Sequence, residues 1–235
     1  MMATISPFSL SHSWSVHWNR LPSNFKERPI LGEIAKNEEE ALKAIASVGV
    51  ITSTQLFNIF KLNKNKQKRM VYRHRLVQHE LSLNNKEQIS IYTLGVNGAK
   101  IVNLPGYEVN YWVRYTINDT LKRLLFFSFY ERFYPVELLP AVDPFTGGIL
   151  VNNKPMFVYV LRGDLNDFIM YLKWNKINER LIIITESLSF LEQLKPYLHN
   201  IKLRVIEDSS VFDKSKSIRE SFYEFKNNDF VQETV

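Results

Sequence analysis

The residues best suited to chemistry form a basic run between Lys61 and Leu76. From residue 41 to residue 100 the chain has ten basic and two acidic residues, a local charge of +8. The whole chain carries +6, so all the other residues together sum to −2. Concentrated positive charge favours a polyanion, because each phosphate that is neutralised releases condensed counterions. We interpret the run as a nucleic-acid-binding segment; the alternative is a solvated lysine-rich surface.

A helix through this run would separate apolar from basic side chains. At about 100° per residue, Met70, Val77 and Leu81 share one face of a helix that continues beyond residue 76. The opposite face carries basic and aromatic side chains, namely Lys68, Tyr72, Arg75 and His79. A helix with these two faces is fit to enter the major groove of DNA.

The candidate DNA contacts divide by their position on this helix. Lys68, Tyr72 and Arg75 are expected at base edges, and residues on the flanks at phosphates. Lys86, at the tip of the hairpin that follows, is expected at an adjacent backbone or minor groove. The full predicted set is Lys64, Lys66, Lys68, Arg69, Tyr72, Arg73, Arg75, His79 and Lys86.

Two helices should precede the basic helix. Residues 38–48 have apolar positions at helical spacing and end before Gly49, a residue typical of a C-terminal cap. Thr52 is an expected N-cap for residues 53–60, and Gln55 stands three positions on, where it completes a capping box. These two helices position the start of the basic run.

A two-stranded ribbon should follow the basic helix. Residues 61–65 are a short, asparagine-rich link that favours a turn between helices. Residues 81–83 and 89–94 predict strands around a hairpin turn at 84–87, because apolar and polar residues alternate at the strand period. Three helices followed by a ribbon is the order of a winged helix-turn-helix.

Three stretches of this region resemble a known family. They are Gly49-Val50-Ile51-Thr52-Ser53-Thr54-Gln55-Leu56, Tyr72-Arg73-His74-Arg75-Leu76-Val77 and Tyr92-Thr93-Leu94-Gly95-Val96-Asn97-Gly98-Ala99. They are similar to the bacterial replication-relaxation proteins of plasmids and other mobile elements. The resemblance covers roughly residues 37–208 and is concentrated in the winged-helix part. It implies DNA binding by a winged helix in front of an α/β domain, in replication, transfer (the relaxosome) or transcription control.

The middle of the chain holds a break and a strongly apolar helix. Residues 96–102 predict a short helix, and Leu104-Pro105-Gly106 suits a domain boundary. The next helix has Asn118 or Asp119 as its expected N-cap, and apolar side chains cover nearly its whole circumference. We expect a core helix buried on more than one side; a bridge between domains or a dimer contact is the alternative.

From Pro135 onward, strands and helices alternate. Strands are expected over residues 154–161, 180–185 and 201–206, and helices over 165–175 and 188–198. This alternation predicts an α/β unit with some parallel pairing. The predicted fold class is α/β, or α+β overall, with an N-terminal winged helix-turn-helix followed by a small α/β domain. The expected domains are an arm (1–36), the winged helix (37–104), the α/β domain (105–212) and a polar tail (213–235) in which 215–225 favour a helix.

The family resemblance implies that the second domain is related to restriction-endonuclease-like folds. Such a nuclease needs two acidic ligands for a divalent cation, and a lysine or base that helps activate water. Asp143 would be the first acid, but the strand over residues 156–162 has neither acid nor lysine. Asp164 comes later, and Asn166 stands two residues beyond it in place of a lysine. We expect a degenerate, non-enzymatic domain with Asp143 as a turn residue.

Other catalytic and metal-binding patterns are missing from the sequence. It has no cysteine, no G-x-x-x-x-G-K-[ST] loop, and five scattered histidines. His12 and His17 stand five residues apart without nearby carboxylates, unlike a metal site. Trp14 and Trp18 are expected to pack the arm against the domain. We predict no cofactor and no metal.

The sequence also limits location and partners. It has no apolar run of about 18 residues and no basic-then-apolar leader, so we expect a cytoplasmic protein. The predicted partner is double-stranded DNA, with a homodimer or a replication or relaxase protein as a further partner and no membrane. The alternatives are a chromosomal winged-helix transcription regulator with a ligand- or partner-binding α/β domain, a metal-dependent nuclease or nicking enzyme, and an adaptor whose winged helix binds protein.

Overall fold

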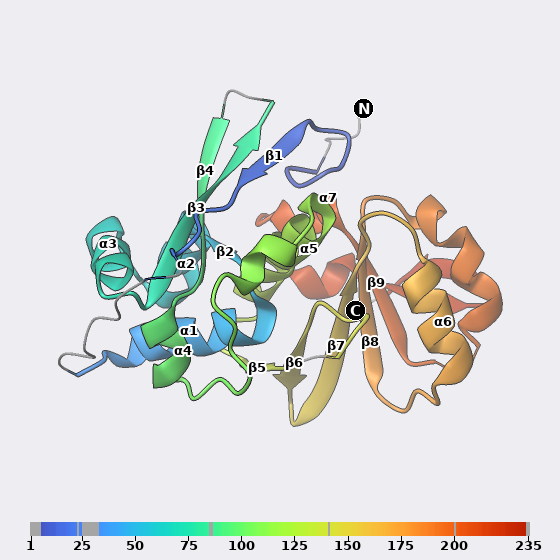
Figure 1. Ribbon diagram of the computed structural model, residues 1–235. Coiled ribbons are helices and arrows are strands. Elements are labelled where there is room, and N and C mark those ends of the chain that lie inside the picture. The colour runs from blue at the N-terminus through green and yellow to red at the C-terminus, as the bar shows by residue number, and fades with distance from the viewer. Residues whose placement is uncertain are drawn as a thin grey trace. The chain divides into compact units, whose positions relative to one another are not determined.

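The computed structural model describes residues 6–22, 24, 33–84, 87–140, 142–199 and 201–233. It is a mixed α/β structure with two sheets, drawn in Figure 1. One compact unit spans Ser11–Phe127, and the other joins the described residues of 1–10 to those of 128–235. We call them the four-stranded unit and the seven-stranded unit. The division falls inside helix α5 (Ile117–Glu131), whereas the sequence placed a boundary near residue 105.

The four-stranded unit surrounds an antiparallel sheet of order β1-β3-β4-β2. Its elements are β1 (Trp14–His17), α1 (Lys36–Val48), β2 (Ile51–Thr52), α2 (Ser53–Phe60), α3 (Lys64–Tyr72), β3 (Leu76–Leu83), β4 (Glu87–Leu94), α4 (Val96–Ile101), the 3-10 helix η1 (Tyr111–Arg114) and the first part of α5. Figure 1 shows β1, which comes from the expected arm, beside the β3–β4 hairpin.

Side-chain hydrogen bonds cap the starts of α2 and α5 in this unit. The predicted capping box of α2 is confirmed, because Thr52 Oγ1 accepts a hydrogen bond from the Gln55 N–H at 3.1 Å and Gln55 Oε1 accepts one from the Thr52 N–H at 3.0 Å. The predicted cap of α5 is wrong. Thr116, rather than Asn118 or Asp119, stands before the helix, and its Oγ1 accepts from the Asp119 N–H at 3.1 Å.

The basic helix is shorter than predicted. α3 ends at Tyr72, and His74 has a φ of 54°, in the left-handed region that stops a helix. The chain then continues as β3, in which Val77, His79 and Leu81 are all buried. Residues four apart share a face of a strand as well as a face of a helix, so the spacing of Val77 and Leu81 fits both periods. The continuation of the helix past residue 76 was therefore wrong, whereas the predicted hairpin is confirmed.

The seven-stranded unit has the sheet order β11-β10-β9-β8-β7-β6-β5, in which only the β7–β8 and β8–β9 pairs are parallel. Its elements are β5 (Glu137–Leu139), β6 (Gly147–Val151), β7 (Lys154–Val160), α6 (Asn166–Trp174), β8 (Arg180–Thr185), the 3-10 helix η2 (Leu188–Tyr197), β9 (Leu203–Glu207), α7 (Asp208–Phe212), the 3-10 helix η3 (Ile218–Ser221), β10 (Tyr223–Lys226) and β11 (Asp229–Gln232). The three strands predicted for this region are confirmed: β8 has the predicted bounds, and those of β7 and β9 differ by one or two residues.

The end of the chain differs from its prediction. The expected helix over 215–225 is wrong, because β10 and β11 form a hairpin that extends the sheet next to β9. Asn227 and Asn228 turn this hairpin with φ values of 53° and 65°. Paired positive φ angles suit a two-residue hairpin turn, and asparagine tolerates them well. The sequence signal for this hairpin is the Asn-Asn pair between two stretches in which residue types alternate. The helical interpretation of residues 215–225 overlooked it.

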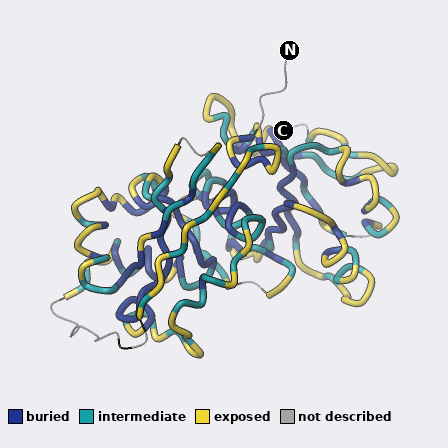
Figure 2. The backbone as a smooth tube through the Cα atoms, turned by 45° about the horizontal axis from the view of Figure 1, so that its top comes forward, coloured by how far each residue is buried: buried dark blue, intermediate teal, exposed yellow. Residues whose placement is uncertain are grey.

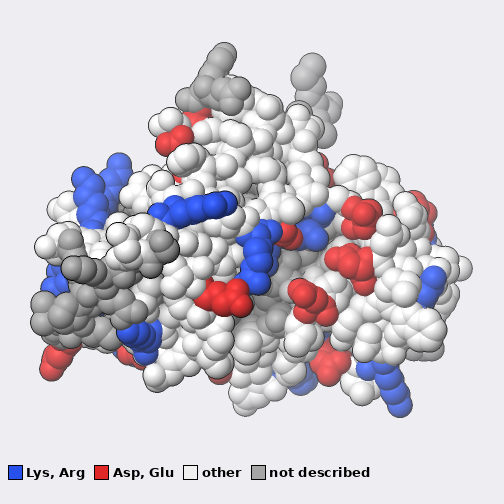
Figure 3. Space-filling view, in the orientation of Figure 1, with Lys and Arg blue, Asp and Glu red and all other residues white. Residues whose placement is uncertain are grey.

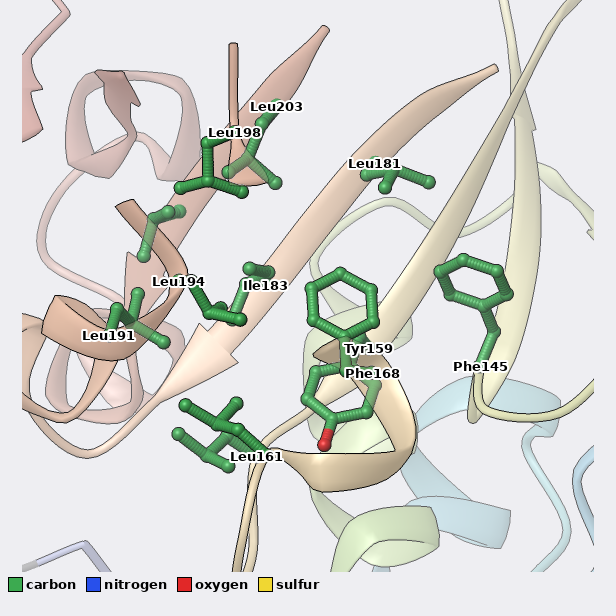
Figure 4. Packing of buried hydrophobic residues seen from close by; sticks show 12 residues of the cluster. Phe145, Tyr159, Leu161, Phe168, Leu181, Ile183, Leu191, Leu194, Leu198 and Leu203 are labelled. Carbon is green, nitrogen blue, oxygen red and sulfur yellow. The ribbon is translucent and has the colours of Figure 1, made fainter. Parts of the chain in front are cut away.

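One face of the large sheet is covered by α6 and η2. Figure 4 shows the packing, in which the Tyr159 ring of β7 stacks on Phe168 of α6 with centroids 4.3 Å apart. Leu181 and Ile183 of β8 and Leu191 of η2 belong to the same buried cluster. Because strand side chains alternate between faces, the even-numbered residues of β7 to β9 point to the opposite face.

Buried residues form the interior of each unit, and Figure 2 shows exposed stretches of the chain mainly at loops and turns. In α5, the side chains from Leu124 to Phe127 are completely buried, which confirms the expectation of burial on more than one side. Across the described segments, no helix has the length and apolar character needed to cross a bilayer.

Candidate nucleic-acid interface

The exposed face of α3 is basic and aromatic. Lys64, Lys68 and Tyr72 follow each other at four-residue spacing and share one face of the helix. All three are exposed, and Tyr72 keeps 67% of its surface accessible. Arg69, beside them, has half of its side chain exposed. Figure 3 shows Lys and Arg groups in blue at the left of the view, where Figure 1 draws α3.

The opposite face of α3 fixes the helix to α2. Met70 is completely buried, and the buried Gln67 accepts a hydrogen bond from Ser53 Oγ at 2.6 Å. Gln67 Nε2 also donates to the Ser53 carbonyl at 3.0 Å and to the Leu62 carbonyl at 2.7 Å. At the start of α3, the Asn63 side chain accepts from the Lys66 N–H at 3.0 Å. A buried amide with partners on both its oxygen and its nitrogen defines which face α3 presents to solvent.

The charges of α3 do not favour the helix itself. No acidic residue lies in its first turn, where the helix dipole favours negative charge, and Lys64 and Lys66 stand there instead. Lys64 and Lys68 are like charges four residues apart, which destabilise a helix by a few tenths of a kcal/mol. A phosphate beside this face would remove both penalties.

Arg75 does not belong to this face, which corrects its predicted role at base edges. Its side chain is 2% exposed, and Nη1 lies 2.6 Å from Oε2 of Glu38, which is equally buried. Glu38 Oε1 accepts a second bond from Arg69 Nη2 at 2.7 Å. Burial lowers the pKa of Arg75 from its ordinary value, and the Glu38 charge opposes this. Glu38 therefore connects α1 to both ends of the α3–β3 junction.

His79 is also buried, and its predicted DNA contact is wrong. Its Nδ1 accepts from the Asn19 N–H at 3.1 Å, and Nε2 lies 2.8 Å from Thr93 Oγ1. The rings of Trp18 and Trp112 lie 4.8 and 5.1 Å from the imidazole, centroid to centroid. Burial lowers the pKa of His79 to about 3. The packing of Trp18 onto the domain agrees with the prediction for the arm.

This histidine should make the protein acid-sensitive. In the unfolded chain His79 is protonated below a pH of about 6.5, whereas in the folded protein it is protonated only near pH 3. The stability that neutral His79 contributes is therefore fully present above pH 6.5 and is lost as the pH falls from 6.5 towards 3. We expect the free energy of unfolding to fall by about 2 kcal/mol from this group between pH 7.5 and 5. Urea unfolding of wild type and His79→Gln at both pH values measures it. The exposed His199→Gln is the control, and an equal loss in wild type and His79→Gln would contradict the assignment.

The other predicted residues are placed as follows. Lys66 and Arg73 are half-buried on the flanks of the α3 face. Lys86 lies outside the described residues. The remaining exposed set is Lys64, Lys68, Arg69 and Tyr72.

The residues weighed for a nuclease are dispersed along the seven-stranded unit. Asp143 is exposed in the turn before β6, and Asp164 Oδ1 accepts from the Asn166 N–H at 3.0 Å in the loop before α6. No group of three or more His, Asp or Glu side chains suited to a metal ion occurs within the residues described.

Comparison with known proteins adds nothing to this geometry. No protein-family model matches the chain, and no curated protein and no solved structure matches it. The resemblance to the replication-relaxation proteins rests on the three sequence stretches alone.

Proposed function

We propose that the four-stranded unit is a winged helix that binds duplex DNA, with α3 in the major groove and the β3–β4 hairpin as the wing. The observation that carries the proposal is the face of α3, which exposes lysine, arginine and tyrosine and contains no acidic residue. With its side chains an α-helix is ~10–12 Å across, which fits a major groove ~12 Å wide. The order of helices and strands from α1 to β4, with β2 paired to β4, supports the same proposal.

The revised contacts differ from the sequence-based set at two residues. Lys68 and Tyr72 take the base-edge positions on the centre of the exposed face, without Arg75 or His79. Lys64, Lys66, Arg69 and Arg73 take the phosphate positions on its ends and flanks. Arg69 is held by Glu38, so its guanidinium is oriented before DNA arrives.

The biological setting follows from the resemblance alone. We assign the protein to site-specific DNA recognition in replication, transfer or transcription control of a plasmid or mobile element, in the cytoplasm. After Asp143, residues 156–162 contain neither an acid nor a lysine, so the proposal assigns binding without cleavage. A chromosomal regulator with the same winged helix would bind DNA through the same face.

The test is the salt dependence of DNA binding. Fluorescence anisotropy of a labelled random-sequence duplex, from about 50 to 200 mM salt, compares wild type with Lys64→Ala/Lys66→Ala, which removes two of the proposed phosphate contacts. Each lost phosphate contact reduces the slope of log K against log salt by about 0.9, so the double variant should lose up to about two units of slope. Lys43→Ala, an exposed α1 lysine paired with Glu39 at 2.6 Å, is the matched control and should match wild type.

A Tyr72 variant distinguishes recognition of the DNA sequence from electrostatic attraction to the phosphates. On a duplex selected from a random pool, Tyr72→Ala should lose roughly 1–3 kcal/mol of discrimination over random DNA and keep the salt slope. Absence of duplex binding at low salt, or a double variant that behaves like Lys43→Ala, would reject the winged-helix proposal and favour an adaptor that binds protein.

A further inference from the structure

The face of the large sheet opposite α6 and η2 carries a hollow of about 640 Å³. It lies over the first residues of β7, β8 and β9 and along β10, where Met156, Ile182, Arg204 and Glu224 contribute to its lining. These residues alternate with the buried cluster under α6 and η2, so they point to the other side of the sheet. All lining residues belong to the seven-stranded unit.

The lining is rich in Lys and Arg side chains, and some of them have no carboxylate partner among the described residues. Two of the cations are paired: Arg204 Nε donates to Glu233 Oε1 at 2.6 Å, and Lys226 forms an ion pair with Glu224. Three more line the hollow, namely Lys154, Arg180 and Arg219. Within the described part of the chain, none of these three has an ion-pair partner. An excess of three positive charges thus faces a concave surface.

The chemistry of the hollow fits a small phosphorylated molecule better than a nucleic-acid strand. Its volume lies within the ~300–1,000 Å³ typical of small-ligand sites. Arginine forks match phosphate geometry, and the partly exposed Phe133, Val151 and Val231 offer an apolar surface for a flat ring. Glu224 and Glu233 would accept hydrogen bonds from hydroxyl or amino groups, and they would repel a continuous phosphate backbone.

We infer that this hollow binds a phosphorylated ligand of nucleotide size, with its phosphate at Lys154, Arg180 and Arg219 and its ring over the apolar surface. The inference is independent of DNA binding, because it uses none of the residues of α3. It gives the seven-stranded unit a ligand-binding role.

The experiment is isothermal titration of the full chain with AMP, GMP, ADP and GDP, compared with adenosine, guanosine, inorganic phosphate and a single-stranded thymidine oligonucleotide. At least one nucleotide should bind, and its nucleoside should bind at least about tenfold more weakly, as expected when charge-assisted hydrogen bonds are lost. Arg180→Ala and Arg219→Ala should each weaken nucleotide binding by on the order of tenfold. Lys176→Ala, an exposed lysine of the same unit outside the hollow, should leave it unchanged.

Three results would overturn the inference. They are no binding of any nucleotide at millimolar concentration, binding that persists unchanged in Arg180→Ala and Arg219→Ala, and binding of the oligonucleotide alone. Both arginines are at least partly exposed, so the variants should fold, and equal thermal unfolding of variant and wild type checks this.

Discussion

Replacing Glu38 by glutamine should lower the free energy of unfolding of the four-stranded unit by about 3–5 kcal/mol. Glu38 and Arg75 are each 2% exposed, and their charged atoms lie 2.6 Å apart. Glutamine has nearly the same shape but no charge, so the Arg75 guanidinium would stay buried without a counter-charge. The same change removes the partner that holds Arg69 on α3.

Tryptophan fluorescence during urea unfolding reports this change, because Trp112 is completely buried in the same unit. Glu39→Gln is the matched control. Glu39 is the next residue of α1 and pairs with exposed Lys43, and such a surface pair contributes at most about 1 kcal/mol. If Glu38→Gln and Glu39→Gln have the same small effect, the Glu38 bridge does not stabilise the fold. A DNA affinity that falls with Glu38→Gln while folding is intact would show that Arg69 needs its carboxylate partner.

Replacing Arg162 by methionine should destabilise the seven-stranded unit by a similar amount, about 3–5 kcal/mol. Arg162 is 1% exposed and forms an ion pair with the equally buried Asp208. Its Nε donates to the Phe8 carbonyl at 2.9 Å, and Nη1 donates to the Leu161 carbonyl at 2.7 Å. The variant leaves a buried carboxylate and two carbonyls without this donor. Arg162 therefore ties residues near Phe8 to the ends of parallel strands β7 and β9.

Hydrogen exchange measured by mass spectrometry suits this variant, since Trp174 is 77% exposed and a poor reporter of the unit. Peptides from β7, β8 and β9 should exchange faster in Arg162→Met, whereas the exposed Arg219→Met should match wild type. Adding Asp208→Asn to Arg162→Met should recover part of the loss, because the completely buried charge is then removed and the remaining carboxylate, Glu186, is partly exposed and keeps its hydrogen bond from Ser9 Oγ. Unchanged protection in Arg162→Met would show that the network contributes nothing to stability.

The buried Glu38–Arg75 ion pair explains why charge alone placed Arg75 wrongly among the DNA contacts. In the sequence, Arg75 stands within the same basic run as Lys68 and Arg69 and has the same residue type as a DNA contact. Its partner Glu38 lies 37 residues earlier, and nothing local shows that the two meet. The exposure of Arg69 and the burial of Arg75 were decided by how α1 packs near the end of α3.

Short-range sequence signals were sufficient to predict an element wherever neighbouring residues alone determine it. The Thr52 and Gln55 pair set the start of α2, and the apolar run from residue 180 to 185 became β8 as predicted. Capping involves residues three apart, and a fully buried parallel strand needs only a continuous apolar run. Of the predicted basic face, Lys68 and Tyr72 are exposed on α3 as expected, because helical spacing within the nine residues of α3 places them together, whereas Arg75 and His79 are buried.

The tertiary structure decided whether the segments whose apolar spacing fits both a helix and a strand became one or the other. Val77 and Leu81 suit a helix and a strand equally, and pairing with β4 selected the strand, which carried His79 into contact with Asn19, 60 residues away. The same held at the end of the chain, where pairing with β9 drew β10 into the sheet. The sequence by itself determined the start of α2, the inner strands, and the exposed positions of Lys68 and Tyr72 on α3. Long-range pairing determined the burial of Arg75 and His79 and the hollow on the large sheet, because those depend on residues that only folding brings together.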